Sequence, residues 1–205
     1  AMRHLESLTD GVSRRATIQR HLLPVMLSWF ADGADPDAGL LAFRQISDAL
    51  GGTHWYLGML RDEGTAAQRL ARVLSTSRYA VDLLLRNPET VALLGDREGL
   101  VPQSRDSLDS RLAAAVSRQE DTDGAFAAVR AVRARELVRI TLGHLGARWD
   151  SATVRAALTD LTDAYLQAAL EVARRRVLEQ REEEPATVLA IIGMGKAGAR
   201  ELNYL

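Results

Sequence analysis

The residues best suited to chemistry lie near the end of the chain, in a glycine-rich turn. The spacing G-x-G-x-x-G is met by Gly193, Gly195 and Gly198, and Lys196 stands between the last two. A glycine has no Cβ, so the backbone at these positions can approach an anion closely. A β-branched apolar run, residues 188–192, precedes the turn, and the helix-compatible sequence Ala-Arg-Glu-Leu follows it. Because a strand, a glycine turn and the first amides of a helix form a phosphate cradle, we predict nucleotide binding by these four residues.

Lys196 has a further distinction, since it is the single lysine among 26 basic residues. Everywhere else the sequence uses arginine. A lysine offers a compact charge to a phosphate, whereas arginine offers a planar fork. We therefore interpret Lys196 as a phosphate ligand, with chance placement as the alternative.

Other chemistry finds little support in the sequence. The turn is no Walker A loop, because Ala197 follows Lys196 where a serine or threonine is required. The aspartates of residues 32–37 suit helix capping better than a calcium loop. No pairing of a nucleophile with a base, and no pair of catalytic carboxylates, can be recognised. We predict no catalytic residue and no metal ligand in this chain, whose histidines also lack metal-binding spacing: His4, His21, His54 and His144.

Composition narrows the class of protein. The 205 residues carry a formal net charge of −1, which argues against a nucleic-acid binder or a protein of anionic membranes. No apolar run approaches about 18 residues, so no membrane span is expected. Cysteine is absent, which fits a cytoplasmic protein.

Apolar periodicity predicts an all-α, multi-helix bundle. Helices are expected over residues 13–31 with a kink or restart at Pro24, over 36–50 after an Asp35 N-cap, over 104–118 and 123–145, and from Ser151 to about 181. Shorter helices should follow caps at Thr53, Thr65 and Ser77, with a break at Asn87–Pro88 and a loop over 95–103.

An acidic cluster and a proline, residues 182–185, mark the expected domain boundary. We predict a helical scaffold over residues 1–184. Residues 185–205 would then begin a second domain, with a strand, the glycine turn and the start of a helix.

One helix carries several arginines with spacings of three and four. Such spacings place most of them along one flank of the helix, with Glu136 among them. A solvated face is the simpler interpretation, and a nucleotide-side or partner surface is the alternative. The residues are Arg130, Arg133, Arg135 and Arg139.

The residues from Ile191 to Tyr204 closely resemble the signature that opens each catalytic domain of the glutamine synthetase adenylyltransferase family. The family motif reads Gly-Met-Gly-Lys-x-Gly-x-Arg-Glu-Leu-Asn-Tyr, and this chain departs only mildly, at Ala197 and Ala199. Residues 77–89 and 133–140 look like the helical region that precedes a catalytic head of that family.

The resemblance implies a two-headed enzyme of nitrogen assimilation. It also implies that residues 185–205 are the truncated beginning of an α/β nucleotidyltransferase domain. One head would move AMP from ATP onto a tyrosine of glutamine synthetase, and the other would remove it by phosphorolysis, both with Mg²⁺. A PII-type regulatory protein would be a further partner. The family motif continues into Ser-Asp-x-Asp, whose carboxylates would hold the metal ions.

We therefore expect a fragment cut at the start of a catalytic domain, inactive alone and with no bound cofactor. Which of the two heads follows is left open. Two alternatives also remain: a helical domain before a Rossmann oxidoreductase, and a self-sufficient helical interaction module.

Overall fold

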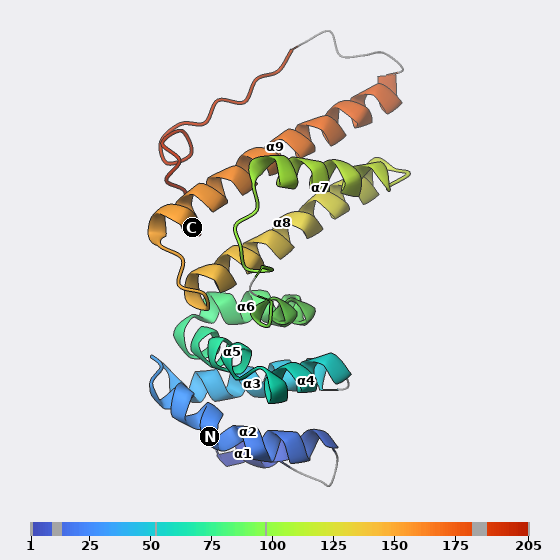
Figure 1. The fold of residues 1–205 in the computed structure, drawn as a ribbon. Helices are drawn as coiled ribbons and strands as arrows, with labels where there is room; N and C mark the ends of the chain where they lie inside the picture. The colour runs from blue at the N-terminus through green and yellow to red at the C-terminus, as the bar shows by residue number, and fades with distance from the viewer. Residues whose placement is uncertain (1, 10–13, 52, 97, 182–187, 205) are drawn as a thin grey trace. The chain divides into compact units, whose positions relative to one another are not determined.

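The computed structural model describes residues 2–9, 14–51, 53–96, 98–181 and 188–204. Within these ranges the chain is helical without a strand, so the all-α prediction is confirmed (Figure 1). The α-helices are α1 Met2–Thr9, α2 Arg14–Ala31, α3 Pro36–Leu50, α4 His54–Asp62, α5 Gly64–Thr76, α6 Arg78–Arg86, α7 Arg105–Ser117, α8 Thr122–Leu145 and α9 Ser151–Arg181, with a 3₁₀ helix, η1, at Pro88–Leu94.

The chain divides into two compact units. The first unit contains residues 1–101 and 141–149, and the second contains residues 102–140 and 150–205. None of the helices in the described ranges is both long and apolar enough to cross a membrane. The predicted boundary near residue 184 falls within 182–187, outside the described residues, and stays a prediction.

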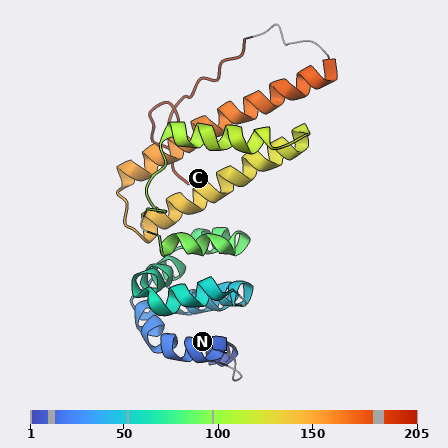
Figure 2. The same ribbon diagram turned by 45° about the vertical axis from the view of Figure 1, so that its right-hand side comes forward.

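Helix α5 is the centre of the first unit, where it packs against α2, α3, α4, α6 and η1 (Figure 2). Alanines at three of its core positions allow this, because a small side chain lets neighbouring helices come close. Phe30 and Phe43 meet beside it as tilted rings, 6.1 Å apart between centroids. Within the same core, the hydroxyls of Ser47 and Tyr56 share a buried hydrogen bond of 2.8 Å. That bond satisfies two polar groups that burial would otherwise penalise.

Helix α7 packs on α9 in the second unit. Leu112 of α7 and Leu161 of α9 are almost fully buried. Helix α8 is tied to α9 by two polar contacts. Arg176 of α9 pairs with Asp123 of α8 at 3.2 Å, and the Arg133 guanidinium of α8 lies 5.3 Å from the centre of the Tyr165 ring of α9.

Two of the predicted helix caps are confirmed. The Asp35 carboxylate accepts a hydrogen bond from the amide of Ala38 at 3.0 Å. The hydroxyl oxygen of Ser77 accepts one from the amide of Ala80 at 3.3 Å. Ser104, which was not predicted as a cap, accepts one from the amide of Ser107 at 3.2 Å. These side chains satisfy amides that have no partner inside their own helix.

Other details of the helix prediction were wrong. Thr53 precedes α4, but its hydroxyl donates to the Leu50 carbonyl at 2.6 Å instead of capping the new helix. Helix α5 begins at Gly64, with Glu63 rather than Thr65 at the N-cap position. Helix α1 was not predicted. Helix α2 continues through Pro24 without a restart, because buried side chains on both sides of the proline hold its two halves in the core.

The predicted strand and helix start near the end of the chain were also wrong. Residues 188–194 have no strand assignment, and residues 195–200 form turns that do not continue into a helix. A strand needs the backbone of a neighbour for its hydrogen bonds. The described part of the chain contains no such neighbouring strand.

Candidate nucleotide-binding turn

The glycine-rich segment folds as one tight turn of helix-like backbone. The amide of Ala199 donates to the Gly195 carbonyl at 2.9 Å, and that of Gly198 approaches the Met194 carbonyl at 3.5 Å. Both bonds span four residues, as in an α-helix. The segment therefore has a defined local fold although it lacks regular secondary structure.

Arg200 ends this turn. Its φ of 56° is left-handed, the conformation that commonly terminates a helix. The amide of Arg200 donates to the Ala197 carbonyl at 3.2 Å, and that of Glu201 donates to the Lys196 carbonyl at 2.7 Å. This pair of bonds is a Schellman motif, and it explains why the expected helix stops after a single turn.

The three glycines have different roles in the turn. Gly195 has a φ of 58°, which an L-residue with a side chain rarely adopts. A Cβ on Gly198 would lie 2.6 Å from the carbonyl oxygen of Gly193, so these two glycines are in direct backbone contact. The compactness of the turn thus depends on the G-x-G-x-x-G spacing.

The segment leading into the turn exposes an apolar surface. Val188 is 97% exposed, and Ile192 and Met194 are each 82% exposed. Contiguous exposed apolar side chains usually mark a surface that another structure covers. Residues 188–194 therefore have the apolar composition of a buried strand, although their side chains are exposed in this structure.

Arg200 also fastens the turn to α9. Its Nη2 donates to Oδ1 of Asp160 at 2.6 Å. The side chain of Asp160 is 24% exposed and that of Arg200 is 54% exposed. The hydrogen bond with the Asp160 carboxylate raises the pKa of the Arg200 guanidinium.

A cavity of about 540 Å³ lies between this segment and α9. Gly193 and Gly198 line it on one side, and Gln167 lines it on the other. Arg105 also lines the cavity, but it already pairs with Asp109 at 3.0 Å. The turn is thus held over a partly polar space rather than against a packed core.

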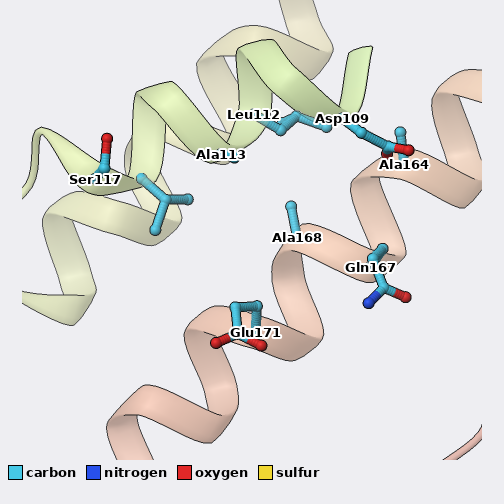
Figure 3. Close-up of a pocket in the computed structure, with 9 residues that line it drawn as sticks. Asp109, Leu112, Ala113, Ser117, Ala164, Gln167, Ala168 and Glu171 are labelled. Atoms are coloured by element: carbon cyan, nitrogen blue, oxygen red, sulfur yellow. The ribbon is translucent and has the colours of Figure 1, made fainter. Parts of the chain in front are cut away.

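A second cavity in this unit, of about 450 Å³, lies between α7 and α9 (Figure 3). Leu112, Ala164 and Ala168 give it an apolar wall, and Asp109 and Glu171 are its acidic groups. None of its lining residues is basic. A triphosphate would find no positive partner there, which leaves the glycine turn as the better candidate.

The predicted arginine flank does not form one surface. Arg130, Arg133 and Arg135 are exposed, whereas Arg139 is only 9% exposed. Glu136 is almost completely buried. The interpretation as a solvated or partner surface is therefore wrong for Arg139.

Glu136 is the centre of a buried charge cluster. Its Oε1 lies 2.5 Å from Nη1 of Arg111, and its Oε2 lies 3.1 Å from Nε of Arg139. Sequence reasoning missed Arg111, which lies 25 positions away on α7. A glutamate at an apolar helix position was the available signal, because a buried carboxylate needs a cationic partner.

Metal binding finds no support among the described residues, where no group of three or more His, Cys, Asp or Glu side chains could hold an ion. Lys196 and the three glycines lie together in the turn, as the sequence predicts. Their binding of a nucleotide stays a prediction.

Comparison with known proteins decides the family. The model of the family described as glutamate-ammonia ligase adenylyltransferase matches residues 67–205, about two thirds of the chain. The chain belongs to this family. The match includes the glycine turn as well as helices of both units.

Adenylyltransferases of this family from three bacteria are about half identical to the chain. All three carry the name bifunctional glutamine synthetase adenylyltransferase/adenylyl-removing enzyme. The protein of Streptomyces coelicolor is 50% identical over 100% of the chain and 22% of its own length. That of Leifsonia xyli is 51% identical over 100% of the chain and 20% of its own length, and that of Cutibacterium acnes is 50% identical over 99% and 20%.

The chain thus spans about a fifth of the length of these adenylyltransferases. No solved structure matches it. Family membership removes the alternative of a Rossmann oxidoreductase.

Proposed function

We propose that the chain is the helical region leading into a nucleotidyltransferase domain of a glutamine synthetase adenylyltransferase. The parent enzyme would transfer AMP from ATP to a tyrosine of glutamine synthetase and remove it by phosphorolysis. The observation that carries the proposal is the family match over residues 67–205, which extends through the glycine turn. The identity of 50% and 51% to enzymes of that name, over the whole of this chain and about a fifth of theirs, supports it.

The turn would contribute to this chemistry by binding phosphate. Gly193 and Gly198 are in backbone contact, so no side chain keeps a phosphate away from the main chain there. Lys196 is exposed on the same turn and would add a positive charge beside the phosphates. Fixed positive groups of this kind stabilise the charge that develops during phosphoryl and nucleotidyl transfer.

The exposed run 188–194 would be the first strand of the catalytic sheet in the longer protein. Its residues form a near-continuous apolar run, which is typical of a strand covered on both faces. In the longer protein a neighbouring strand would supply the hydrogen bonds. This proposal retains the division into a helical region, 1–184, and the opening of the catalytic domain, 185–205.

The Mg²⁺ of the reaction would be held outside this chain. The described residues offer no set of carboxylates that fits the ion. By the resemblance, those carboxylates belong to the Ser-Asp-x-Asp sequence expected after Tyr204. When bound, the ion would supply positive charge to the reacting phosphate.

The helical region would serve as a scaffold and docking surface. Glutamine synthetase is the expected substrate protein, and a PII-type regulator is the expected signalling partner. A binding assay of the chain with each protein tests this part of the proposal. Absence of binding to both would restrict the helices to a scaffold role.

The phosphate role is tested by substitution in the parent enzyme. Gly198→Ala places a Cβ against the Gly193 carbonyl and should distort the turn. We expect the KM for ATP to rise or kcat to fall at one catalytic head, by at least about tenfold. Gly58→Ala is the control, because its Cβ would have no neighbour within 4 Å. Equal effects of the two substitutions would contradict the proposal.

A further inference from the structure

A polar cavity of about 310 Å³ lies in the first unit, remote in sequence from the glycine turn. The end of α2, the C-terminal half of α5 and the loop after α8 form its walls. Arg72 and Thr76 line it from α5, Trp29 lines it from α2, and Arg148 lines it from the loop. A volume near 300 Å³ is the lower end of the range for small-ligand sites.

Positive charge is in excess in this cavity. Arg72 and Arg148 both line it, and among the described residues neither guanidinium takes part in an ion pair or a hydrogen bond. Most of the other arginines that make a side-chain contact form an ion pair with a carboxylate, as Arg61 does with Asp62 at 2.6 Å. The one acidic residue of the lining, Asp32, is exposed, where water screens its charge.

Arg148 occupies a backbone conformation that favours glycine. Its φ is 59°, in the left-handed region. The following residue fixes this geometry, because the amide of Trp149 donates to the Gly143 carbonyl at 3.1 Å. The indole of Trp149 also covers Gly143 so closely that a Cβ there would lie 2.3 Å from the ring. An arginine held in a strained position points to a use for its side chain.

The opposite wall is equally well fixed. The amide of Asp35 donates to the Ser75 carbonyl at 3.1 Å, which ties the loop after α2 to the end of α5. Gly33 lies against Ser75, since a Cβ on that glycine would be 2.2 Å from the Ser75 hydroxyl. Trp29 and Arg72 are therefore presented from a rigid frame.

We propose that this cavity binds the phosphate group of a small molecule between Arg72 and Arg148. A phosphate monoester carries a charge between −1.5 and −2 at neutral pH, which two guanidiniums neutralise. Each guanidinium can donate two parallel hydrogen bonds to phosphate oxygens. The Trp29 ring provides an apolar surface for the remainder of the molecule. The proposal does not depend on the role of the glycine turn.

The experiment measures binding of inorganic phosphate and of glycerol phosphate to the 205-residue chain by calorimetry at low ionic strength, with acetate as a monoanionic probe. Arg72→Ala and Arg148→Gly should each weaken phosphate binding at least about tenfold. Arg61→Ala is the control: it removes one positive charge outside the cavity and should change the affinity for phosphate by less than about twofold. Arg148→Gly should leave the thermal midpoint unchanged or raised, because glycine tolerates the left-handed backbone.

The two phosphate probes distinguish the source of the ligand. Tighter binding of glycerol phosphate indicates a phosphorylated metabolite, and tighter binding of inorganic phosphate indicates the free ion. Acetate binding as tight as phosphate would overturn the proposal in favour of a carboxylate site. Absence of saturable binding by the unsubstituted chain up to about 10 mM, or equal losses in Arg61→Ala and Arg72→Ala, would also overturn it.

Discussion

Removal of the Glu136 carboxylate should be among the most damaging single changes in the second unit. The side chain of Glu136 is 2% exposed, and that of Arg139, its partner at 3.1 Å, is 11% exposed. Glu136→Ala would remove the partner carboxylate of this buried guanidinium, and loss of one partner in a fully buried pair costs about 3–5 kcal/mol.

The expected cost is smaller than that range for a structural reason. Arg111, the second partner, is 35% exposed and can turn into water when Glu136 is removed. Exposed ion pairs contribute at most about 1 kcal/mol, so most of the cost comes from Arg139. We expect Glu136→Ala to lower the free energy of unfolding by about 2–3 kcal/mol.

Urea unfolding followed by circular dichroism measures this change. Glu171→Ala is the matched control on α9, because Glu171 and Arg174 are both more than half exposed and 4.0 Å apart. The control should lose less than about 0.5 kcal/mol. Replacing Glu136 and Arg139 together by leucine and methionine should cost less than Glu136→Ala alone, since no buried charge is left. A loss below about 1 kcal/mol for Glu136→Ala, or one equal to the control, would refute the reasoning.

Three further predictions concern the turn, a helix cap and the activity. Endoproteinase Lys-C should cut the chain only after Lys196, its single lysine. Arg200→Ala should speed this cleavage roughly twofold to fivefold, because it releases the turn from Asp160. An unchanged cleavage rate would show that the ion pair does not hold the turn. The amide of Thr153 donates a hydrogen bond to the Asp150 carboxylate and lowers the pKa of that carboxyl group. This cap therefore stabilises the fold fully above the unfolded pKa of about 3.9. The stabilisation is lost as the pH falls through the lower folded pKa. Asp150→Asn should therefore weaken the acid dependence of stability below about pH 4, and an identical pH profile in the two proteins would contradict this. The 205-residue chain should not transfer AMP to glutamine synthetase with ATP and Mg²⁺, and measurable turnover in a radiolabel assay would overturn the proposed division of the enzyme.

Local sequence signals were sufficient for most of the helices. Asp35 and Ser77 could be recognised as caps because the capping bond joins residues three apart. The helix restart predicted at Pro24 does not occur, because buried side chains on both sides of the proline hold α2 together. A local sequence pattern contains the proline but carries no information about this packing.

The site was predictable in composition but not in conformation. The spacing of the glycines predicted a backbone open to an anion, and the structure adds a direct backbone contact between Gly193 and Gly198 that was not predicted. The end of the turn at Arg200 was missed, because arginine has no intrinsic preference for the left-handed conformation that it adopts. Its contact with Asp160 spans 40 positions, and no spacing rule reaches that far.

The central claim is that the turn around Lys196 binds the phosphates of a nucleotide in the parent adenylyltransferase. The most direct test follows AMP transfer to glutamine synthetase, and its phosphorolytic removal, by the parent enzyme with Lys196→Gln. We predict that one of the two activities falls at least about tenfold while the other is unchanged, which also shows that the protein is folded. Two unchanged activities would contradict the claim.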